Sequence, residues 1–311
     1  MSSRQVVKWF RLYRDSEPHK NERLNQIVLD FRSDEKLGGA PLVNAIAAVR
    51  RIVKEYPAPY TLLVSGGVDS QVMLYAWKMS GVAFNAVHYT YGTNTADTDS
   101  VIEFCEKQAI KLDIRTFDAK GFISSKKLVE MAKRYDCTSP QILTYIEFTK
   151  QHPETCLMAG NFVQPQAAGI NWTIYGLERF SQLDKPNFIP FFLLSTPKLA
   201  YSFYDLDVAF KYEMFSTTGS RDDYITKTKS YQTAGFPVIP QAQKFTGFEE
   251  IKASYDSVVV PGQKRIQWAN MPSKRPFDIL YRYSLYDHTG KYAETYRLVH
   301  HQSINIQVPQ H

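Results

Sequence analysis

The sequence has little cysteine, no long apolar run and no apolar N-terminal segment. Its three cysteines, Cys105, Cys137 and Cys156, stand far apart in 311 residues, and none forms a Cys-x-x-Cys pair. This scarcity argues against a disulfide framework and a structural zinc site, and it predicts a reducing, cytoplasmic location. No stretch of about 18 apolar residues occurs, so no membrane span is expected. The first five residues contain no apolar core, so no secretory signal is expected either.

The composition is otherwise that of an ordinary globular chain with a basic surplus. Hydrophobic residues make up 44% of the sequence, and the formal net charge is +6. The length allows one large domain or two modest ones. A basic balance fits nucleic-acid binding, and it equally fits a surface that handles anionic nucleotides. No zinc-finger, RRM or KH signature selects the first of these, so nucleic acid stays open as a partner.

The most informative stretch is an apolar run that stops at two glycines and gives way to a helical pattern. Residues 62–64 are typical of a buried strand, and Val72, Ala76 and Met79 recur at helical spacing after the turn. A glycine-rich turn between strand and helix presents backbone N–H groups at a helix N-terminus, which favours phosphate. No GxxxxGK[ST] sequence is present, which disfavours a Walker-type enzyme acting on the γ-phosphate.

The residues of this turn are candidate ligands of a phosphate group and its metal ion. Gly66 and Gly67 have no Cβ, so the backbone can approach an anion closely. Ser65 and Ser70 add hydroxyl donors, and Asp69 is placed to hold a Mg²⁺ that bridges the phosphates. The expected nucleotide-binding residues of the turn are Val64, Ser65, Gly66, Gly67, Val68, Asp69 and Ser70.

The segment Ser65-Gly-Gly-Val-Asp-Ser70 resembles the SGGxDS signature of the PP-loop ATP pyrophosphatases. That family includes asparagine, GMP, NAD and argininosuccinate synthetases, and enzymes that modify tRNA or deazaguanine bases. The resemblance covers roughly residues 58–235. It implies that ATP and Mg²⁺ are bound and that ATP is cleaved between its α and β phosphates. The chain is also similar to PP-loop proteins of large tailed phages, on residues 196–203, which implies the cytoplasm of an infected host.

Strand and helix patterns alternate after residue 60 and predict an α/β fold with a doubly wound, mostly parallel sheet of the Rossmann-like kind. Further strands are expected at 82–89, 112–117 and 156–159, and helices at 41–55, 98–109, 124–135, 140–151, 197–212 and 221–234. The aromatic stretch 164–197 is interpreted as a binding loop. Residues 279–286 and 292–299 flank a turn and predict a hairpin.

Three regions follow from these patterns. Residues 1–57 are an N-terminal extension with a helix, 58–235 are the ATP-binding domain, and 236–311 are a strand-rich region. The last region is not needed for ATP binding in the family, so we expect it to shape the acceptor site or self-association. In a homo-oligomer, the hairpin edge at 281–286 would be covered by a neighbouring subunit.

Other site residues are implied by the resemblance. The strand end at His88 and Tyr89 would lie beside the adenine and ribose, and His88 is either a base or a hydrogen-bonded structural histidine. Gly160 and Asn161 would lie near the ATP, after the fourth strand. A late basic residue would neutralise the departing pyrophosphate. The candidates are Lys198, Arg221, Lys227, Lys229 and Lys244. We place Lys244 in the catalytic set with Asp69 and Ser70, because its context is the most motif-like.

The expected function is an ATP-dependent synthetase that adenylates a carboxylate, an amide or a nucleobase carbonyl for attack by an amine or another nucleophile. Two alternatives stay open: an adenylylsulfate reductase or sulfurtransferase, and a nucleotide-binding module without turnover. Intact Asp69 and both serines favour the enzyme over the module. Val68, where those reductases commonly have lysine, disfavours sulfur chemistry. The His-His-x-x-Asp-Asp element of the tRNA-lysidine branch is absent.

Overall fold

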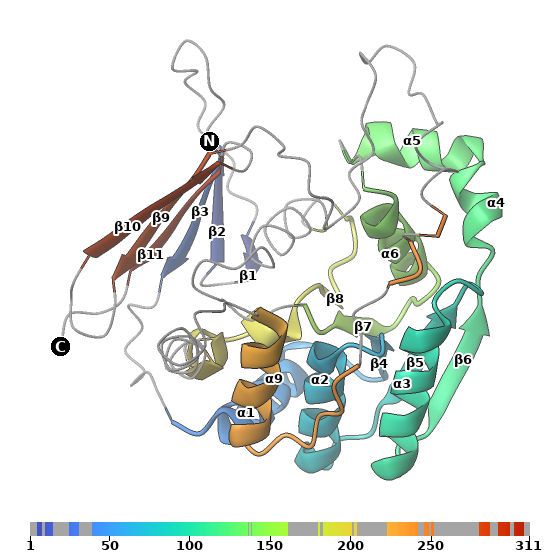
Figure 1. The fold of residues 1–311 in the computed structure, drawn as a ribbon, viewed down its shortest axis with the longest axis horizontal. Helices are drawn as coiled ribbons and strands as arrows, with labels where there is room; N and C mark the ends of the chain where they lie inside the picture. Colours follow the sequence, from blue (N-terminus) through green and yellow to red (C-terminus); the bar gives the residue numbers. More distant parts are fainter. Residues whose placement is uncertain are drawn as a thin grey trace.

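The computed structural model contains two sheets with different strand arrangements (Figure 1). It describes residues 39–135, 137, 139–160, 180, 183–200, 202–203, 223–241, 246–248 and 250–251, and the backbone of the strands at 5–7, 10–14, 25–30, 280–286, 292–298 and 302–307. Everything below concerns these residues.

The first sheet has five strands in the order β6-β5-β4-β7-β8, and every neighbouring pair is parallel. The strands are β4 (Tyr60–Val64), β5 (Asn85–Thr90), β6 (Leu112–Thr116), β7 (Thr155–Met158) and β8 (Phe188–Ile189). The chain runs outward from β4 to one edge and later returns to the other side of β4. At such a reversal the carboxyl ends of the strands border a crevice suited to a ligand.

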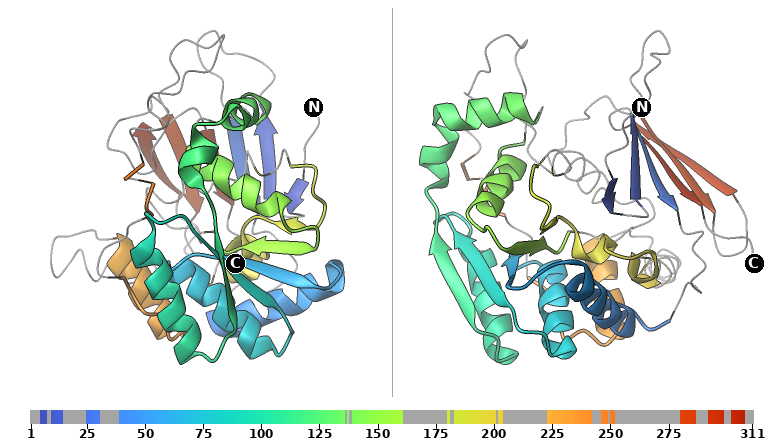
Figure 2. Two further views of the ribbon diagram at one scale, coloured as in Figure 1. Left: turned by 90° about the vertical axis from the view of Figure 1, so that its right-hand side faces the viewer. Right: turned by 180° about the vertical axis from the view of Figure 1, so that it is seen from behind.

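Helices cover both faces of this sheet, which confirms the predicted doubly wound α/β fold (Figure 2). On one face lie α1 (Pro41–Glu55), α2 (Val68–Ser80) and α3 (Thr95–Lys107), and on the other lie α4 (Ala119–Ile123), α5 (Lys126–Arg134) and α6 (Pro140–Lys150). A further helix, α9 (Asp223–Thr233), lies beside α2. None of the described helices is long and apolar enough to cross a membrane.

The apolar core explains why β4 and α2 take these positions. Leu62 and Val64 of β4 join Val72, Ala76 and Trp77 of α2 in one buried cluster. The spacing of Val72 and Ala76 places them on one face, as the sequence predicts. Met79, which was expected on the same face, is 48% exposed instead. The helix then ends at a glycine with φ 74° at position 81, a left-handed conformation that glycine adopts at low cost.

Two segments differ from the expected pattern. The stretch 164–197 is not a loop throughout, because β8 adds to the sheet beside β7 and a short 3-10 helix follows at Phe192–Leu194. A two-residue strand is too short to show a period in the sequence. The five-residue helix α4 was missed for the same reason. In the predicted helix 197–212, residues 197–200, 202 and 203 are helical, and the rest lies outside the described residues.

The second sheet joins the two ends of the chain, in the order β1-β2-β3-β11-β9-β10. Its strands are β1 (Gln5–Val7), β2 (Phe10–Arg14), β3 (Asn25–Asp30), β9 (Leu280–Tyr286), β10 (Tyr292–Leu298) and β11 (Gln302–Gln307). The antiparallel pair β9–β10 confirms the predicted hairpin. The expectation of an open edge at 281–286 was wrong, because β11 pairs with β9 on its other side. Only two of the six residues of β11, Ile304 and Ile306, are apolar, so its alternation is too short to have been read as a strand.

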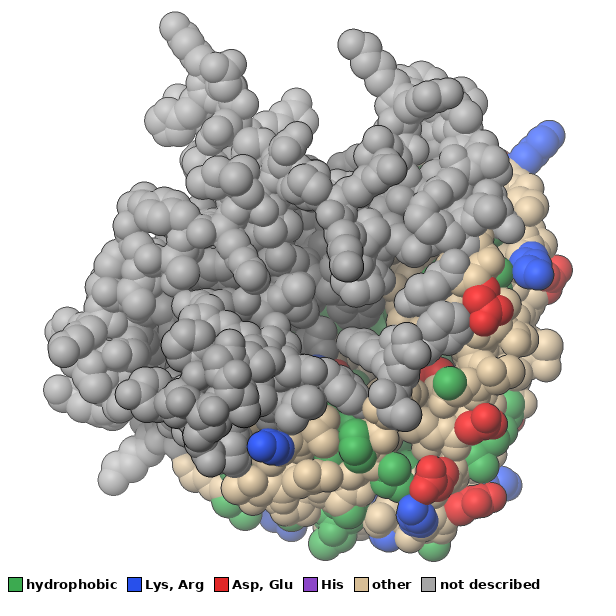
Figure 3. Space-filling model, viewed as in Figure 1, with side chains coloured by type: hydrophobic (Ala, Val, Ile, Leu, Met, Phe, Trp, Pro, Cys, Tyr) green, Lys and Arg blue, Asp and Glu red, His purple; other side chains and the backbone are tan. Residues whose placement is uncertain are grey.

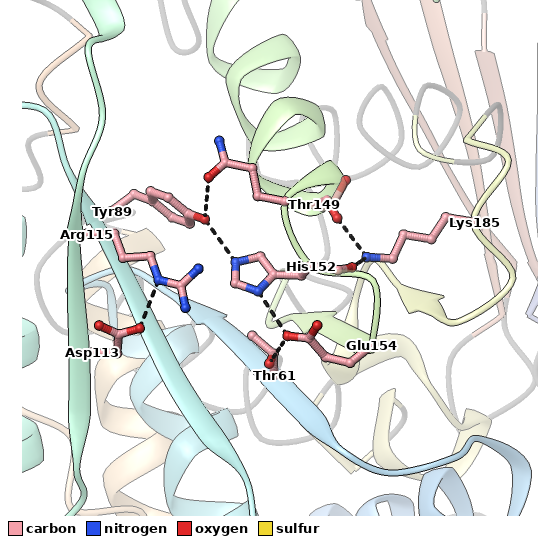
Figure 4. A network of polar contacts seen from close by, with 9 residues as sticks. Thr61, Tyr89, Asp113, Arg115, Thr149, His152, Glu154 and Lys185 are labelled. Carbon is pink, nitrogen blue, oxygen red and sulfur yellow. Dashed lines mark hydrogen bonds and ion pairs between the residues drawn. The ribbon is translucent and has the colours of Figure 1, made fainter.

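A chain of hydrogen bonds fixes the corner between α6 and β7 to the neighbouring strands (Figure 4). The Tyr89 hydroxyl lies 2.9 Å from His152 Nε2. On the other side of the ring, His152 Nδ1 lies 3.0 Å from Glu154 Oε1, which also accepts a hydrogen bond of 2.5 Å from Thr61 Oγ1. The Tyr89 ring stacks on Phe148 of α6, with 4.0 Å between centroids. This series of hydrogen bonds therefore connects β4, β5, α6 and β7 through polar groups that all have partners.

Two buried histidines make the stability of this fold dependent on pH. Burial lowers the pKa of His88 and of His152 below the ordinary value of 6.5, and the hydrogen bond and neighbouring carboxylate of each ring only partly oppose this effect. The unfolded chain therefore binds more protons than the folded chain at pH values just below 6.5. Their contribution to stability is complete above that pH and falls as the pH drops toward the folded-state pKa.

We predict that the free energy of unfolding decreases between pH 7.5 and 5.5, by at most about 1.4 kcal/mol per pH unit for each histidine. Urea denaturation at a series of pH values measures this slope. His88→Gln and His152→Gln should each make this slope shallower, and the double variant should make it shallowest. An unchanged slope in the double variant would contradict the assignment.

Candidate functional site

The turn between β4 and α2 is closed by its two serines. The Ser65 N–H donates a 3.0 Å hydrogen bond to Ser70 Oγ, and the two hydroxyl oxygens are 3.1 Å apart. The Gly67 N–H donates to Ser65 Oγ at 3.3 Å. Because each serine holds the other, the turn has one shape before any ligand arrives.

The same turn presents backbone donors toward the carboxyl edge of the sheet. Within the described part of the chain, the N–H groups of Gly66, Val68 and Asp69 have no acceptor. Val68 and Asp69 open α2, and the first N–H groups of a helix have no partner inside it. Together with the positive end of the helix dipole, these donors favour an anion.

The two glycines serve different purposes. A Cβ on Gly66 would lie 2.1 Å from the backbone oxygen of Asp97, at the start of α3. A Cβ on Gly67 would meet only Ser65 Oγ, at 3.4 Å. Position 66 must therefore be glycine because α3 approaches it closely. At Gly67 the space that a Cβ would occupy is open. The sequence predicts an anion beside both glycines, and the open side of Gly67 is the place that leaves room for one.

A buried glutamine connects this turn to the chain after α9. The Gln71 side chain donates to the carbonyl oxygens of Gly66 and Ile239, each at 3.0 Å, and accepts from the Ile239 N–H at 2.7 Å. Ser100 of α3 donates a further 3.0 Å bond to the Gly66 carbonyl. The carbonyl of Gly66 is thus held from two helices, which turns its peptide away from the phosphate side.

The segment after α9 continues across the start of α3. Gln241 Nε2 lies 3.1 Å from Asp97 Oδ1. The Tyr91 hydroxyl donates to the Thr246 carbonyl, and the Tyr91 ring lies 5.2 Å from that of Phe248. Residues 239, 241, 246 and 248 therefore lie beside the turn between β4 and α2 and the start of α3, although they are more than 160 positions from that turn in the sequence.

Asp69 is bound by two residues of α9. Lys227 Nζ lies 2.5 Å from Asp69 Oδ2, and the Tyr231 hydroxyl donates to Asp69 Oδ1. Lys227 is 5% exposed and Tyr231 is fully buried. The two residues are four positions apart on the helix, so they share one face. Both oxygens of the carboxylate that the sequence assigns to Mg²⁺ are therefore engaged within the protein.

The side chains of His88 and Tyr89 are turned into the protein. His88 Nδ1 donates to the Val64 carbonyl at 2.9 Å, and His88 Nε2 lies 2.9 Å from Thr98 Oγ1. His88 thus has the arrangement of a structural histidine, the second of the two possibilities given above. The Tyr89 carbonyl accepts from Asn94 Nδ2 at 3.0 Å.

The remaining expected site residues are distributed unevenly. Gly160 follows β7 with φ 68°, and a Cβ there would lie 1.9 Å from the Phe191 ring. Packing against Phe191 at the end of the strand therefore explains why this position is glycine. Lys198 is partly buried and Lys229 is exposed. Asn161, Arg221 and Lys244 lie outside the described residues.

The three cysteines are buried. Burial raises the pKa of Cys105 to about 11 and that of Cys156 to about 12. Because the thiolate is the reactive form, these two thiols are poorly suited to sulfur transfer.

Sequence reasoning missed four residues of this site: Gln71, Ser100, Tyr231 and Gln241. Gln71 directly follows the SGGVDS segment and occupies a helix position otherwise used by apolar residues, which is a signal for a buried polar role. The spacing of Lys227 and Tyr231 at i and i+4 was also readable. No local pattern indicates that Ser100 and Gln241 reach the turn.

Comparison with known proteins gives matches over part of the chain. No model of a protein family matches it. Over 79 residues it is 34% identical to a tRNA(Ile)-lysidine synthase of Chlamydia abortus and 30% identical to one of Chlamydia trachomatis serovar L2. Each match covers 24% of this chain, which spans about 25% of the length of these relatives. Lysidine synthases belong to the PP-loop group that the Ser65–Ser70 segment resembles, so motif and relatives agree on the general class.

Two solved structures align over most of their length. An NMN synthetase from Francisella tularensis aligns over 72% of this chain and 98% of its own, with 14% identity and a TM-score of 0.32. An NH3-dependent NAD synthetase from Campylobacter jejuni aligns over 66% and 97%, with 13% identity and a TM-score of 0.31. The fold described above rests on the strand order of this chain itself.

We predict that alanine substitutions at the two glycines separate stability from ligand binding. Gly66→Ala forces a Cβ against the Asp97 carbonyl and should destabilise the protein by about 1–3 kcal/mol. Gly67→Ala should change the free energy of unfolding by less than about 1 kcal/mol, the range of a helix-cap change, but should weaken binding of an anionic ligand. Urea denaturation and calorimetric titration with pyrophosphate measure the two effects. Equal destabilisation by both substitutions would contradict these assignments.

Proposed function

We propose that this protein is an ATP pyrophosphatase of the PP-loop type, which cleaves ATP to AMP and pyrophosphate and uses the AMP group to activate an acceptor. The observation that carries the proposal is the turn from Ser65 to Ser70, closed by its serines, whose N–H groups at the carboxyl edge of a parallel sheet have no acceptor among the described residues. The match to lysidine synthases supports the same class.

In this proposal the chain acts mainly by positioning charge. The N–H groups of Gly66, Val68 and Asp69 donate to phosphate oxygens, and the hydroxyl of Ser70 is the nearest side-chain donor. An oxygen of the acceptor attacks the α-phosphorus, the bond from that phosphorus to the bridging oxygen breaks, and pyrophosphate leaves. A nucleophile then attacks the activated acceptor carbon and releases AMP. Donors aimed at developing phosphate charge are the main source of acceleration in such reactions.

The residues present fit a Mg²⁺ ion that arrives with the nucleotide. No group of three or more His, Cys, Asp or Glu side chains suited to a metal occurs among the described residues. Among the described residues, Asp69 therefore belongs to no such group of ligands. Phosphate oxygens of the nucleotide would supply the other metal ligands. Bound there, the ion would neutralise phosphate charge.

The late cation is assigned to Lys227 in this proposal, because it already lies at the turn through Asp69. Lys229 projects from a different side of α9, since residues two apart on a helix do not face each other. The role given to Lys244 by the sequence remains an expectation.

The acceptor class is a carboxylate, an amide or a nucleobase carbonyl. The relatives are named for making lysidine in tRNA(Ile), which favours a nucleobase carbonyl in RNA. The face of the molecule in Figure 3 shows basic and acidic side chains interspersed on the described residues, without a continuous basic area. The two buried thiols of raised pKa disfavour the sulfurtransferase alternative.

We predict that ATP labelled at the α-phosphate gives labelled AMP, with release of pyrophosphate, when the protein is incubated with bulk tRNA or with a metabolite extract. Ser70→Ala should lower this rate by roughly a hundredfold or more, the effect of removing one donor from a site of this kind. Thin-layer chromatography of the labelled products measures it.

Lys229→Met is the matched control, because it removes an exposed charge from α9 and should leave the rate unchanged. Formation of labelled ADP with orthophosphate would overturn the proposal. So would equal AMP formation by the wild type and by Asp69→Asn.

A further inference from the structure

The cluster of Asp69, Lys227 and Tyr231 also determines how a metal can enter the site. Magnesium prefers carboxylate oxygens, yet each oxygen of Asp69 already receives a donor from α9. The two donors are shielded from solvent, since Lys227 is 5% exposed and Tyr231 is fully buried, whereas the Asp69 side chain is 17% exposed. A free divalent cation would therefore have to displace an ammonium group at close range, against the repulsion between the two positive charges.

We propose that Lys227 and a divalent metal ion compete for Asp69, so that the site accepts the metal only together with a polyphosphate. This inference rests on the proposed function, and it names the form in which the ligand is bound: a complex of metal and polyphosphate, with neither component binding strongly alone.

The polyphosphate supplies negative charge, which a free cation does not bring to the site. A free metal ion would place its charge beside that of the Lys227 ammonium group, which already neutralises Asp69. A bound phosphate chain brings negative charge within reach of the ammonium group, and Asp69 then becomes available to the metal. The negative charges of Asp69 and of the phosphate chain are then shared between the two cations.

The same exchange assigns a positioning role to Tyr231. Its hydroxyl donates to the oxygen of Asp69 that Lys227 does not contact. It therefore holds the carboxylate in one orientation whether the other oxygen faces the ammonium group or the metal. Loss of this hydroxyl should weaken the contact between α9 and the turn without changing any charge.

Binding of Mn²⁺ to the full-length protein, followed by the electron paramagnetic resonance signal of the free ion, tests this inference. The wild type should bind little Mn²⁺ alone, and should bind it readily when α,β-methylene-ATP is added. Lys227→Met should bind Mn²⁺ without nucleotide at least about tenfold more tightly than the wild type, since a charged hydrogen bond no longer opposes the ion. Lys229→Met makes the same charge change two residues away and should behave as the wild type.

Three results would overturn the inference. They are equal Mn²⁺ affinity in the wild type and Lys227→Met, an equal gain in Lys229→Met, and a gain that persists when Asp69→Asn is added to Lys227→Met. If Lys227→Met does not fold, as judged by circular dichroism, Lys227→Gln decides, because it removes the charge and keeps a polar side chain: it should bind Mn²⁺ alone more tightly than the wild type, and an unchanged affinity would overturn the inference.

The outcome for the proposed function is separate. If the wild type binds Mn²⁺ with the nucleotide analogue but no variant gains affinity without it, the competition is wrong and the nucleotide site stands. If the wild type binds neither the analogue nor the ion in its presence, the proposed function itself fails.

Discussion

The close approach of the Gly66 backbone to the first turn of α3 determines the geometry of the candidate site. With a Cβ position only 2.1 Å from the Asp97 carbonyl, no residue other than glycine fits there without movement. This contact brings the starts of α2 and α3 together at the carboxyl edge of the sheet. It also lets Ser100 reach the Gly66 carbonyl. The orientation of the peptide groups in the turn follows from this packing, so the donors are placed by the fold before a ligand is present.

Parts of the fold could be read from the sequence because they depend on local periodicity. The helix at 41–55 has the bounds of α1, and the strand before the SGGVDS segment is β4. The hairpin of β9 and β10 was readable from alternating aromatic residues around a turn. In each case the apolar period, a proline or a glycine carries the information within a few residues. Such signals do not depend on what the segment contacts elsewhere.

The rest depends on contacts between distant segments. The pairing of β3 with β11 joins residues about 277 positions apart, for instance Gln302 with Asn25, and nothing local indicates a partner. The bonds between Gln71 and Ile239 span 168 positions. The role of His88 was open for the same reason: its ring is satisfied by Val64 and Thr98, and only the packed structure shows both partners. Sequence patterns thus identified the glycine-rich turn between β4 and α2, and tertiary contacts determine which residues surround it.

The arrangement around Asp69 shows why a phosphate turn is best completed by a distant helix. Unpaired N–H groups at a helix start attract anions, and an acidic side chain in the first turn satisfies part of that attraction itself. Left unpaired, Asp69 would repel a phosphate chain from the donors beside it. Lys227 neutralises that carboxylate, and Tyr231 adds a donor without adding charge. The local field at the turn therefore stays favourable to an anion, although the residue suited to the metal is itself an anion. In the proposed site, a cation held on α9, 158 positions away in the sequence, would let one turn bind both the metal and the polyphosphate.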